Sequence, residues 1–101
     1  MKNSNNKSID LLIAGQGAAG YAAGLYAARY QIKTILVGQE FGGETAIGGI
    51  IENYPGNAEI DGFDLMLEFK NQVINLDVPI IESNVSSIKK NEGSFTCYLE
   101  N

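Results

Sequence analysis

The stretch that decides the fold is Leu11-Leu12-Ile13-Ala14-Gly15-Gln16-Gly17-Ala18-Ala19-Gly20. An apolar run leads into a Gly-x-Gly-x-x-Gly turn, an alanine-rich helix is predicted over residues 18–30, and a second apolar run follows at residues 34–37. A strand, a glycine turn, a helix and a second strand in this order are typical of a dinucleotide-binding unit.

Each glycine of this turn has a separate physical role. Gly15 permits the tight turn, Gly17 lets a pyrophosphate approach the backbone without a Cβ in the way, and Gly20 lets the helix lie close to the strand. The helix that begins at Ala18 and Ala19 directs free N–H groups and the positive end of its dipole at the phosphates. An isolated glycine fingerprint also occurs in ordinary strand-to-helix turns, so the prediction of dinucleotide binding depends on the whole context.

The composition limits the class of protein. The chain has 101 residues, of which 45% are hydrophobic and 19% charged, and this suits one small folded domain. A net charge of −5 without a basic cluster argues against nucleic acid as a partner. There is no histidine, which removes His-based acid–base catalysis and most zinc sites. We expect neither a catalytic residue nor a metal site in this chain.

Cys97 is the only cysteine, so the chain holds neither an internal disulfide nor a Cys-x-x-Cys redox pair. No apolar run reaches the ~18 residues of a membrane span, and the polar N-terminus does not resemble a signal peptide. We therefore expect a cytoplasmic protein without a membrane partner. Residues 1–8 are expected to form a flexible polar arm.

Hydrophobic periodicity and turn residues predict the other elements. They are a first strand over residues 9–14, a helix over 60–77 with Asp61 as its N-cap, a short third strand at 80–81, and a hairpin of strands 85–90 and 94–99 around 91–93. In the helix, Phe63, Leu67 and Ile74 share one stripe, which Met66, Phe69, Val73 and Leu76 broaden, and we expect this stripe in the core.

The glycine-rich stretch over residues 38–61 is longer than the ~2–6 residues of an ordinary strand-to-helix connection. We interpret it as an irregular functional loop whose backbone approaches a flat or charged ligand. Three strands and a hairpin form only half of a doubly wound domain, so one face of the sheet would lack its cover. We expect the chain to be part of a longer protein; a small stand-alone module is the alternative.

Several further motifs accompany the glycine turn at a specific spacing. They are Leu25-Tyr26-Ala27-Ala28-Arg29, Gly42-Gly43, Ile51-Glu52-Asn53-Tyr54-Pro55-Gly56 and Asp61-Gly62-Phe63-Asp64-Leu65-Met66. Together they resemble the N-terminal FAD-binding segment of low-molecular-weight thioredoxin reductases of the bacterial and archaeal type. The resemblance covers nearly the whole chain. It implies an α/β, Rossmann-like FAD/NAD(P)-binding fold, in which residues 9–101 form the N-terminal part of the FAD-binding domain, with a parallel sheet, helices and a small β-meander hairpin.

The resemblance also implies the cofactor and its contacts. FAD would be bound, with the loop at residues 38–45 along the flavin, Asn53 near the ring, and backbone contacts from Val85 to the adenine. A turn-forming role is the alternative for Asn53. The implied cofactor-binding residues are Gly15, Gly17, Ala18, Ala19, Gly20, Val37, Gly38, Gln39, Glu40, Phe41, Gly42, Gly43, Glu44, Asn53 and Val85.

In the family, electrons pass from NADPH to the flavin, then to a Cys-x-x-Cys disulfide and to thioredoxin or a similar small disulfide protein, and the enzyme is a homodimer. This chain has neither the cysteine pair nor a second glycine fingerprint for NADPH, so residues 1–101 alone are not expected to carry out the reaction. A relative without the cysteine pair, such as a ferredoxin–NADP reductase of the same fold, stays open, as does a non-catalytic, truncated nucleotide-binding module.

The chain departs from the family pattern at two acidic positions. Gly38 stands where an acidic residue for the ribose hydroxyls is expected, and Glu40, two residues further on, either reaches the ribose or is solvated. Glu44 replaces a glutamine that the family usually has. A carboxylate near the flavin pyrimidine would oppose negative charge on the reduced ring, so we predict that it lowers the flavin potential. A plain surface carboxylate is the alternative.

Overall fold

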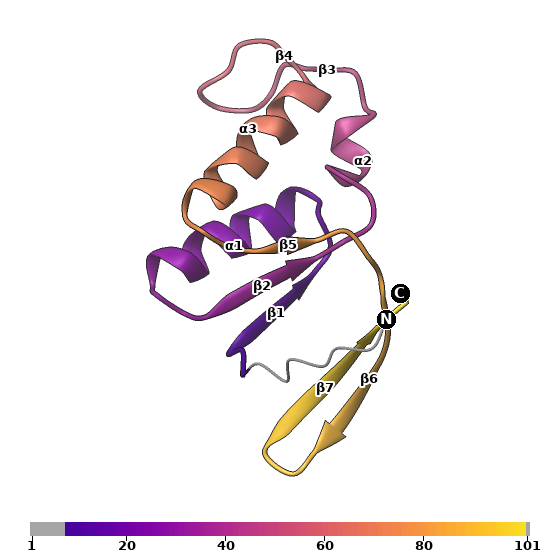
Figure 1. Ribbon diagram of the computed structural model, residues 1–101. Coiled ribbons are helices and arrows are strands. Elements are labelled where there is room, and N and C mark those ends of the chain that lie inside the picture. The colour runs from indigo at the N-terminus through magenta and orange to yellow at the C-terminus, as the bar shows by residue number, and fades with distance from the viewer. Residues whose placement is uncertain (1–7, 101) are drawn as a thin grey trace.

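The computed structural model describes residues 8–100, so the predicted flexible arm lies outside the described residues, apart from Ser8. In chain order the elements are β1 (Leu11–Ala14), α1 (Ala18–Arg29), β2 (Thr34–Val37), α2 (Gly43–Ala46), β3 (Ile50–Ile51), β4 (Ile60–Asp61), α3 (Gly62–Asn75), β5 (Ile80–Ile81), β6 (Val85–Asn91) and β7 (Ser94–Leu99). Figure 1 shows their arrangement in space.

The main sheet is parallel, in the order β1-β2-β5. Leu36 in the central strand is the register partner of Ile13 on one side and of Ile80 on the other. Both long helices, α1 and α3, cover the same face of this sheet, while the antiparallel β6–β7 hairpin projects away from it (Figure 1). This arrangement confirms the prediction of an α/β fold with a parallel sheet, helices and a hairpin.

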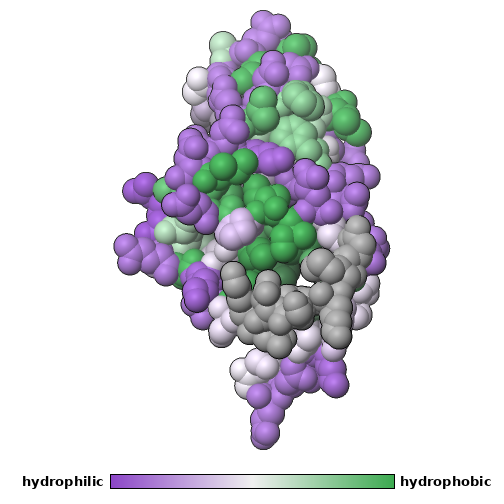
Figure 2. Space-filling model, viewed as in Figure 1, coloured by the Kyte–Doolittle hydropathy of each residue, from purple (hydrophilic) through white to green (hydrophobic). Residues whose placement is uncertain are grey.

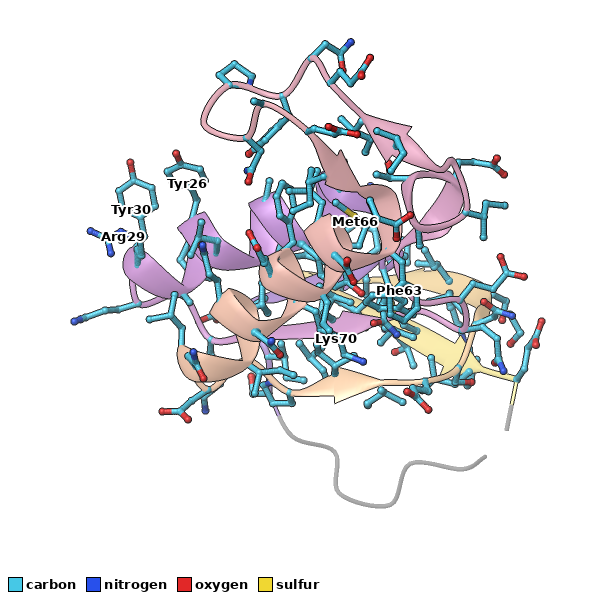
Figure 3. The ribbon with its side chains drawn as sticks, turned by 90° about the horizontal axis from the view of Figure 1, so that it is seen from above. Tyr26, Arg29, Tyr30, Phe63, Met66 and Lys70 are labelled. Atoms are coloured by element: carbon cyan, nitrogen blue, oxygen red, sulfur yellow. The ribbon has the colours of Figure 1, made fainter. Side chains whose placement is uncertain are left out.

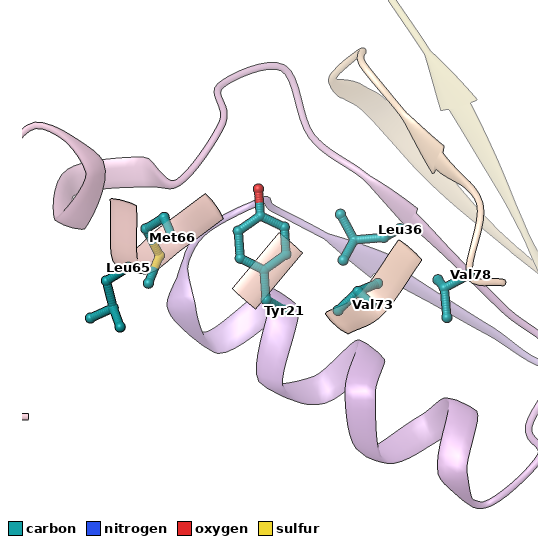
Figure 4. Packing of buried hydrophobic residues seen from close by; sticks show 6 residues of the cluster. All are labelled: Tyr21, Leu36, Leu65, Met66, Val73 and Val78. Carbon is teal, nitrogen blue, oxygen red and sulfur yellow. The ribbon is translucent and has the colours of Figure 1, made fainter. Parts of the chain in front are cut away.

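The core lies between the sheet and the two helices. Its largest fully buried side chains include Tyr21 from α1, Leu36 from β2, and Met66 and Val73 from α3 (Figure 4). Gly24 of α1 faces Val73 and Leu36, where a Cβ would make ordinary contacts of 3.5 Å with Val73 Cγ1 and 3.6 Å with Leu36 Cδ1. The small residues predicted for α1 therefore serve tight packing between helix, helix and sheet.

The prediction that Phe63, Leu67 and Ile74 form a core stripe is wrong. All three are exposed, with between 42% and 49% of their surface accessible. The buried side chains of α3 are Leu65, Met66 and Val73. The helix is apolar around much of its circumference, so periodicity did not identify the face that packs against α1 and the sheet.

The interpretation of residues 38–61 as a wholly irregular loop needs correction, because α2, β3 and β4 lie within it. β3 and β4 form a two-stranded antiparallel pair, and the Gly62 N–H donates to the Gly49 carbonyl at 2.7 Å. These elements are short and depend on such contacts, so they give no periodic signal in the sequence. Asp61 is confirmed as the N-cap of α3, since its carboxylate accepts a hydrogen bond from the Phe63 N–H at 3.0 Å.

The sheet face opposite the helices carries apolar side chains as well. Leu12, Ile35 and Ile81 alternate with residues that face the helices, and all three are partly buried. Figure 2 shows hydrophobic residues gathered near the centre of the molecule in the view of Figure 1. Between residues 8 and 100, no helix combines the length and apolar character needed to cross a membrane.

Candidate functional site

A cavity of about 600 Å³ lies at the carboxyl ends of β1 and β2. Its lining residues are Ala14, Gly15, Gln16, Gly17, Val37, Gly38, Gln39, Glu40, Gly43, Asn84 and Val85. They come from the end of β1 and the glycine turn, from the end of β2 and the segment that follows it, and from the start of the hairpin. Open α/β sheets bind ligands in the crevice at this edge, and the volume is in the range of small-molecule sites.

The three glycines of the turn differ in what surrounds them. Gly15 has a φ of +127°, which favours glycine strongly, and its N–H donates to the Val37 carbonyl at 2.6 Å. A Cβ on Gly20 would collide with the Gly15 carbonyl oxygen. Gly17 lines the cavity, and a Cβ on it would meet no protein atom within 4 Å. Gly17 therefore leaves its backbone open on the cavity side.

The N-terminus of α1 adds a favourable potential for anions. Gly17 is the N-cap, no side chain caps the helix, and no acidic residue lies in the first turn. The helix is 12 residues long, and Arg29 lies in its last turn. The N–H groups that begin the helix at Ala18, Ala19 and Gly20 have no partner four residues back within the helix, and they add to the positive end of its dipole. This end of α1 can accept a phosphate.

The segment after β2 folds back onto the glycine turn. The Gly42 N–H donates to the Gln16 carbonyl at 2.7 Å, and a Cβ on Gly43 would lie 3.4 Å from the Gly17 Cα. Gly42 and Gly43 have φ angles of +75° and +57°, so the reversal of the chain relies on glycine here. The structure thus brings the Gly-Gly pair to the dinucleotide turn.

Phe41 anchors the same segment on α3. Its ring centroid lies 5.0 Å from that of Phe63 and 6.4 Å from that of Tyr21, and Lys70 Nζ lies 5.4 Å from its centroid. Phe63 and Lys70 extend from α3 in Figure 3, whereas Tyr26, Arg29 and Tyr30 project outward from the far end of α1. The Phe41 side chain is held against the core and does not line the cavity.

A buried hydrogen-bond network joins residues beside the cavity. The Gln16 side chain, 3% exposed, donates from Nε2 to the Gly38 carbonyl at 2.7 Å and accepts at Oε1 from the Tyr21 hydroxyl at 2.8 Å. Burial raises the pKa of Tyr21, and a backbone hydrogen bond with Gly42 partly opposes this rise. Tyr21 therefore stays protonated at neutral pH and can donate to Gln16.

The sequence-predicted site residues fall into two groups. Those that line the cavity are Gly15, Gly17, Val37, Gly38, Gln39, Glu40, Gly43 and Val85. Those that do not are Ala18, Ala19, Gly20, Phe41, Gly42, Glu44 and Asn53. Asn53 is exposed in the loop between β3 and β4, where the neighbouring Tyr54 ring packs on Phe69 of α3 at 5.8 Å between centroids. Glu44 is exposed in the first turn of α2.

Ala14, Gln16 and Asn84 line the cavity without having been predicted. Gln16 occupies a variable position of the fingerprint, so the motif itself assigns it no role. Nothing in the sequence pointed to it, because its side-chain partners Gly38 and Tyr21 become its neighbours only in the folded chain. Asn84 could have been inferred only from its place beside Val85.

The chain is similar to thioredoxin reductases in sequence and in structure. It is 38% identical over 92 residues to the thioredoxin reductase of Mycoplasma pneumoniae, covering 90% of this chain and 29% of that protein. It is also 38% identical over 106 residues to that of Borreliella burgdorferi, covering 99% of this chain and 32% of that protein. No protein-family model matches.

Among solved structures, thioredoxin reductase of Lactococcus lactis superposes with a TM-score of 0.89 at 30% identity. The match covers 93% of this chain and 31% of that one. The chain thus spans about three tenths of the length of these relatives. The comparisons confirm both the resemblance expected from the sequence and the partial Rossmann-like fold.

Proposed function

We propose that this relative of the thioredoxin reductases binds FAD in the cavity at the carboxyl ends of β1 and β2, as the FAD-binding part of a NADPH-dependent flavoenzyme. The observation that carries the proposal is Gly17. This residue lines the cavity at the start of α1, and a Cβ there would touch no protein atom. Glycine at such a position is explained by a ligand that must come close to the backbone.

The residues present fit the adenosine and pyrophosphate half of FAD. The first-turn N–H groups of α1 would hold the pyrophosphate, because they meet the cavity at Gly17 without a capping side chain. Glu40 lines the same cavity and would accept hydrogen bonds from the ribose hydroxyls. The Val85 backbone, which also lines the cavity, would contact the adenine.

The flavin half would extend past the segment after β2. Gly42 and Gly43 would follow the flavin with their backbone, and Asn53 and Glu44 would lie at its far end. Of these four residues only Gly43 lines the cavity, so the assignment of Gly42, Asn53 and Glu44 follows the family resemblance. If bound, FAD would supply the redox chemistry, as a group that can accept a hydride and donate electrons. The protein contributes orientation and electrostatics at these positions.

The activity proposed for the whole protein is thioredoxin-disulfide reduction. By family resemblance, the whole protein would use NADPH, act on thioredoxin or a similar small disulfide protein, and work as a homodimer in the cytoplasm. Cys97 is the only cysteine in residues 1–101, so a Cys-x-x-Cys relay would have to come from outside this stretch. On this proposal residues 1–101 alone bear part of the cofactor site and no catalytic cysteine pair.

A matched pair of glycine variants tests the proposal in the full-length protein. Gly17→Ala adds a methyl group at a residue that lines the cavity, whereas Gly48 does not line it, and the Cβ of Gly48→Ala would make ordinary contacts of 3.5 Å and 3.6 Å with the Glu44 and Thr45 carbonyl oxygens. We expect Gly17→Ala to raise the Kd for FAD about tenfold, roughly 1.4 kcal/mol, with Gly48→Ala unchanged. Equal FAD affinity of Gly17→Ala and the wild type, measured by flavin fluorescence titration, would contradict the proposed site.

A further inference from the structure

We propose that Gln16 is a positioning residue, which holds the glycine turn and the segment after β2 at the separation that the dinucleotide requires. This inference rests on the proposed function, because it concerns the same cavity. Gln16 occupies a position of the fingerprint to which the motif assigns no role, and its side chain is one of three buried polar side chains among the described residues, with Thr34 and Ser83.

The contacts of Gln16 join the parts of the site that are distant in sequence. Its side-chain Nε2 donates to the carbonyl of Gly38, 22 residues away, and its backbone carbonyl accepts from the Gly42 N–H. Its Oε1 accepts from Tyr21 in α1. One residue thereby connects the turn, the helix and both ends of the segment over residues 38–42.

The network also fixes the environment of Tyr21. Figure 4 shows the tyrosine ring within the core and its hydroxyl directed toward the chain that follows β2. The ring is 1% exposed, so the hydroxyl depends on a protein partner. No buried side-chain nitrogen or oxygen of the described residues lacks a hydrogen-bond partner. Removing the Gln16 amide would leave the Gly38 carbonyl and the Tyr21 hydroxyl without this partner.

Gln16 leaves no room for a side chain at position 38, where the chain has a glycine. A Cβ on Gly38 would lie 2.7 Å from the Gln16 backbone nitrogen and 2.8 Å from its Cγ, both too close for a real side chain. An acidic residue therefore cannot stand at the end of β2 while Gln16 keeps this position. Glu40, which lines the cavity two residues later, is the acidic side chain left for a ribose.

Gln16 acts through the backbone of its neighbours. Both ends of its amide are already engaged within the protein, and the side chain is almost fully buried. It is thus unavailable as a direct ligand group. Its effect is to hold two backbone segments in place before the cofactor binds, which lowers the cost of ordering them on binding.

The test uses the full-length apoprotein and four variants. Gln16→Met keeps the approximate length but removes both side-chain hydrogen bonds, and Tyr21→Phe removes one of them. Val73→Ala weakens the core away from the cavity, and Gln72→Met changes an exposed glutamine of α3. The Kd values for FAD and for ADP are measured at a temperature where every apoprotein is folded, together with the apoprotein melting temperatures.

We expect Gln16→Met to raise both Kd values tenfold or more, and Tyr21→Phe to raise them about threefold. Val73→Ala is expected to lower the melting temperature at least as much as Gln16→Met while both Kd values stay within twofold of the wild type. Gln72→Met should change neither quantity. ADP is informative because it carries only the half of FAD that the cavity would hold.

Wild-type affinity in Gln16→Met overturns the inference and leaves the proposed function standing, whereas a wild-type protein that binds neither FAD nor ADP overturns both. If Val73→Ala loses as much affinity as Gln16→Met, the role of Gln16 is only structural and the inference fails. If Gln16→Met does not fold, Tyr21→Phe decides, and unchanged affinity in that variant overturns the inference.

Discussion

A Cβ at Gly20 would collide with the Gly15 carbonyl, whereas a Cβ at Gly17, a residue that lines the cavity, would meet no protein atom within 4 Å. The two residues are therefore glycine for different physical reasons, although they belong to one fingerprint. Gly20 serves the packing of helix on strand, and Gly17 leaves room for a ligand. At the scale of single residues, fold and function can thus be separated by experiment.

We predict that Gly20→Ala lowers the free energy of unfolding of the apoprotein by about 1–3 kcal/mol or more, because a backbone oxygen blocks the added methyl group. Gly17→Ala should cost about 1 kcal/mol or less, since its Cβ touches no protein atom and the loss is only that alanine is a poorer N-cap than glycine. Urea denaturation measures both values. Equal destabilisation by the two substitutions would refute this separation.

Glu44 allows a test of the flavin end of the proposed site. If its carboxylate lies near the flavin pyrimidine, it opposes negative charge on the reduced ring. Glu44→Gln should then raise the midpoint potential of the full-length flavoprotein by roughly 10–30 mV, given that ~30 mV of a two-electron couple corresponds to ~1.4 kcal/mol. Glu68→Gln, an exposed position on α3, is the control. Absence of an upward shift in Glu44→Gln would show that this carboxylate is an ordinary surface group.

At the scale of elements, the sequence of α3 defines where the helix begins but not which of its faces is buried. Asp61 caps the helix through a hydrogen bond to the Phe63 N–H. Its buried face carries Leu65, Met66 and Val73, while other apolar side chains point away from the core. The cap and the buried face contribute to stability by different interactions, and each can be tested by itself.

Replacement of the cap should cost about 1 kcal/mol of stability in Asp61→Ala, because the Phe63 N–H loses its acceptor. Asp61→Asn keeps a side-chain oxygen at the same place and should retain most of the stability. Chemical denaturation of the three proteins provides the comparison. An alanine variant as stable as the wild type would mean that the cap hydrogen bond adds nothing.

Two neighbouring residues test which face of α3 is buried. Met66 is 1% exposed and Leu67 is 42% exposed. Met66→Ala should reduce the free energy of unfolding of residues 1–101 by about 2–5 kcal/mol through the cavity it leaves. Leu67→Ala should cost less than about 1 kcal/mol. A larger loss of stability in Leu67→Ala than in Met66→Ala would support the core stripe inferred from periodicity and contradict the packing described above.

These elements show how far the sequence could predict the structure. β2 was predicted at its observed boundaries, since a short run of β-branched and apolar residues after a helix is a strong local signal. The hydrophobic pattern of α3 predicted a helix but not its buried face, because apolar residues occur on several sides. α2, β3 and β4 were missed because contacts with distant segments, such as the bond from Gly62 to Gly49, stabilise them.

The same distinction applies to the candidate site. The glycine fingerprint predicted the turn, and with it Gly15 and Gly17 of the cavity lining, because its requirements are carried by the backbone. The other predicted lining residues, from Val37 to Val85, followed from the family resemblance. Gln16 was missed because its partners, Gly38 and Tyr21, become neighbours only in the folded chain. The proximity of the Gly42–Gly43 segment to the turn is likewise a tertiary property.

At the scale of the whole molecule, the cavity joins three parts of the chain. The turn after β1, the segment after β2 and the start of the hairpin each supply part of its wall. The parallel sheet brings the first two together because its strands end at the same edge. The position of the proposed FAD site therefore follows from the topology, and on this proposal the glycines and Gln16 adapt that edge to the ligand.

The most direct test of this account is the visible absorption spectrum of the purified full-length protein, with identification of any compound released on denaturation. We predict a flavin spectrum and release of FAD, or uptake of added FAD by a preparation that has lost its cofactor. A colourless preparation that also fails to take up added FAD would contradict the account.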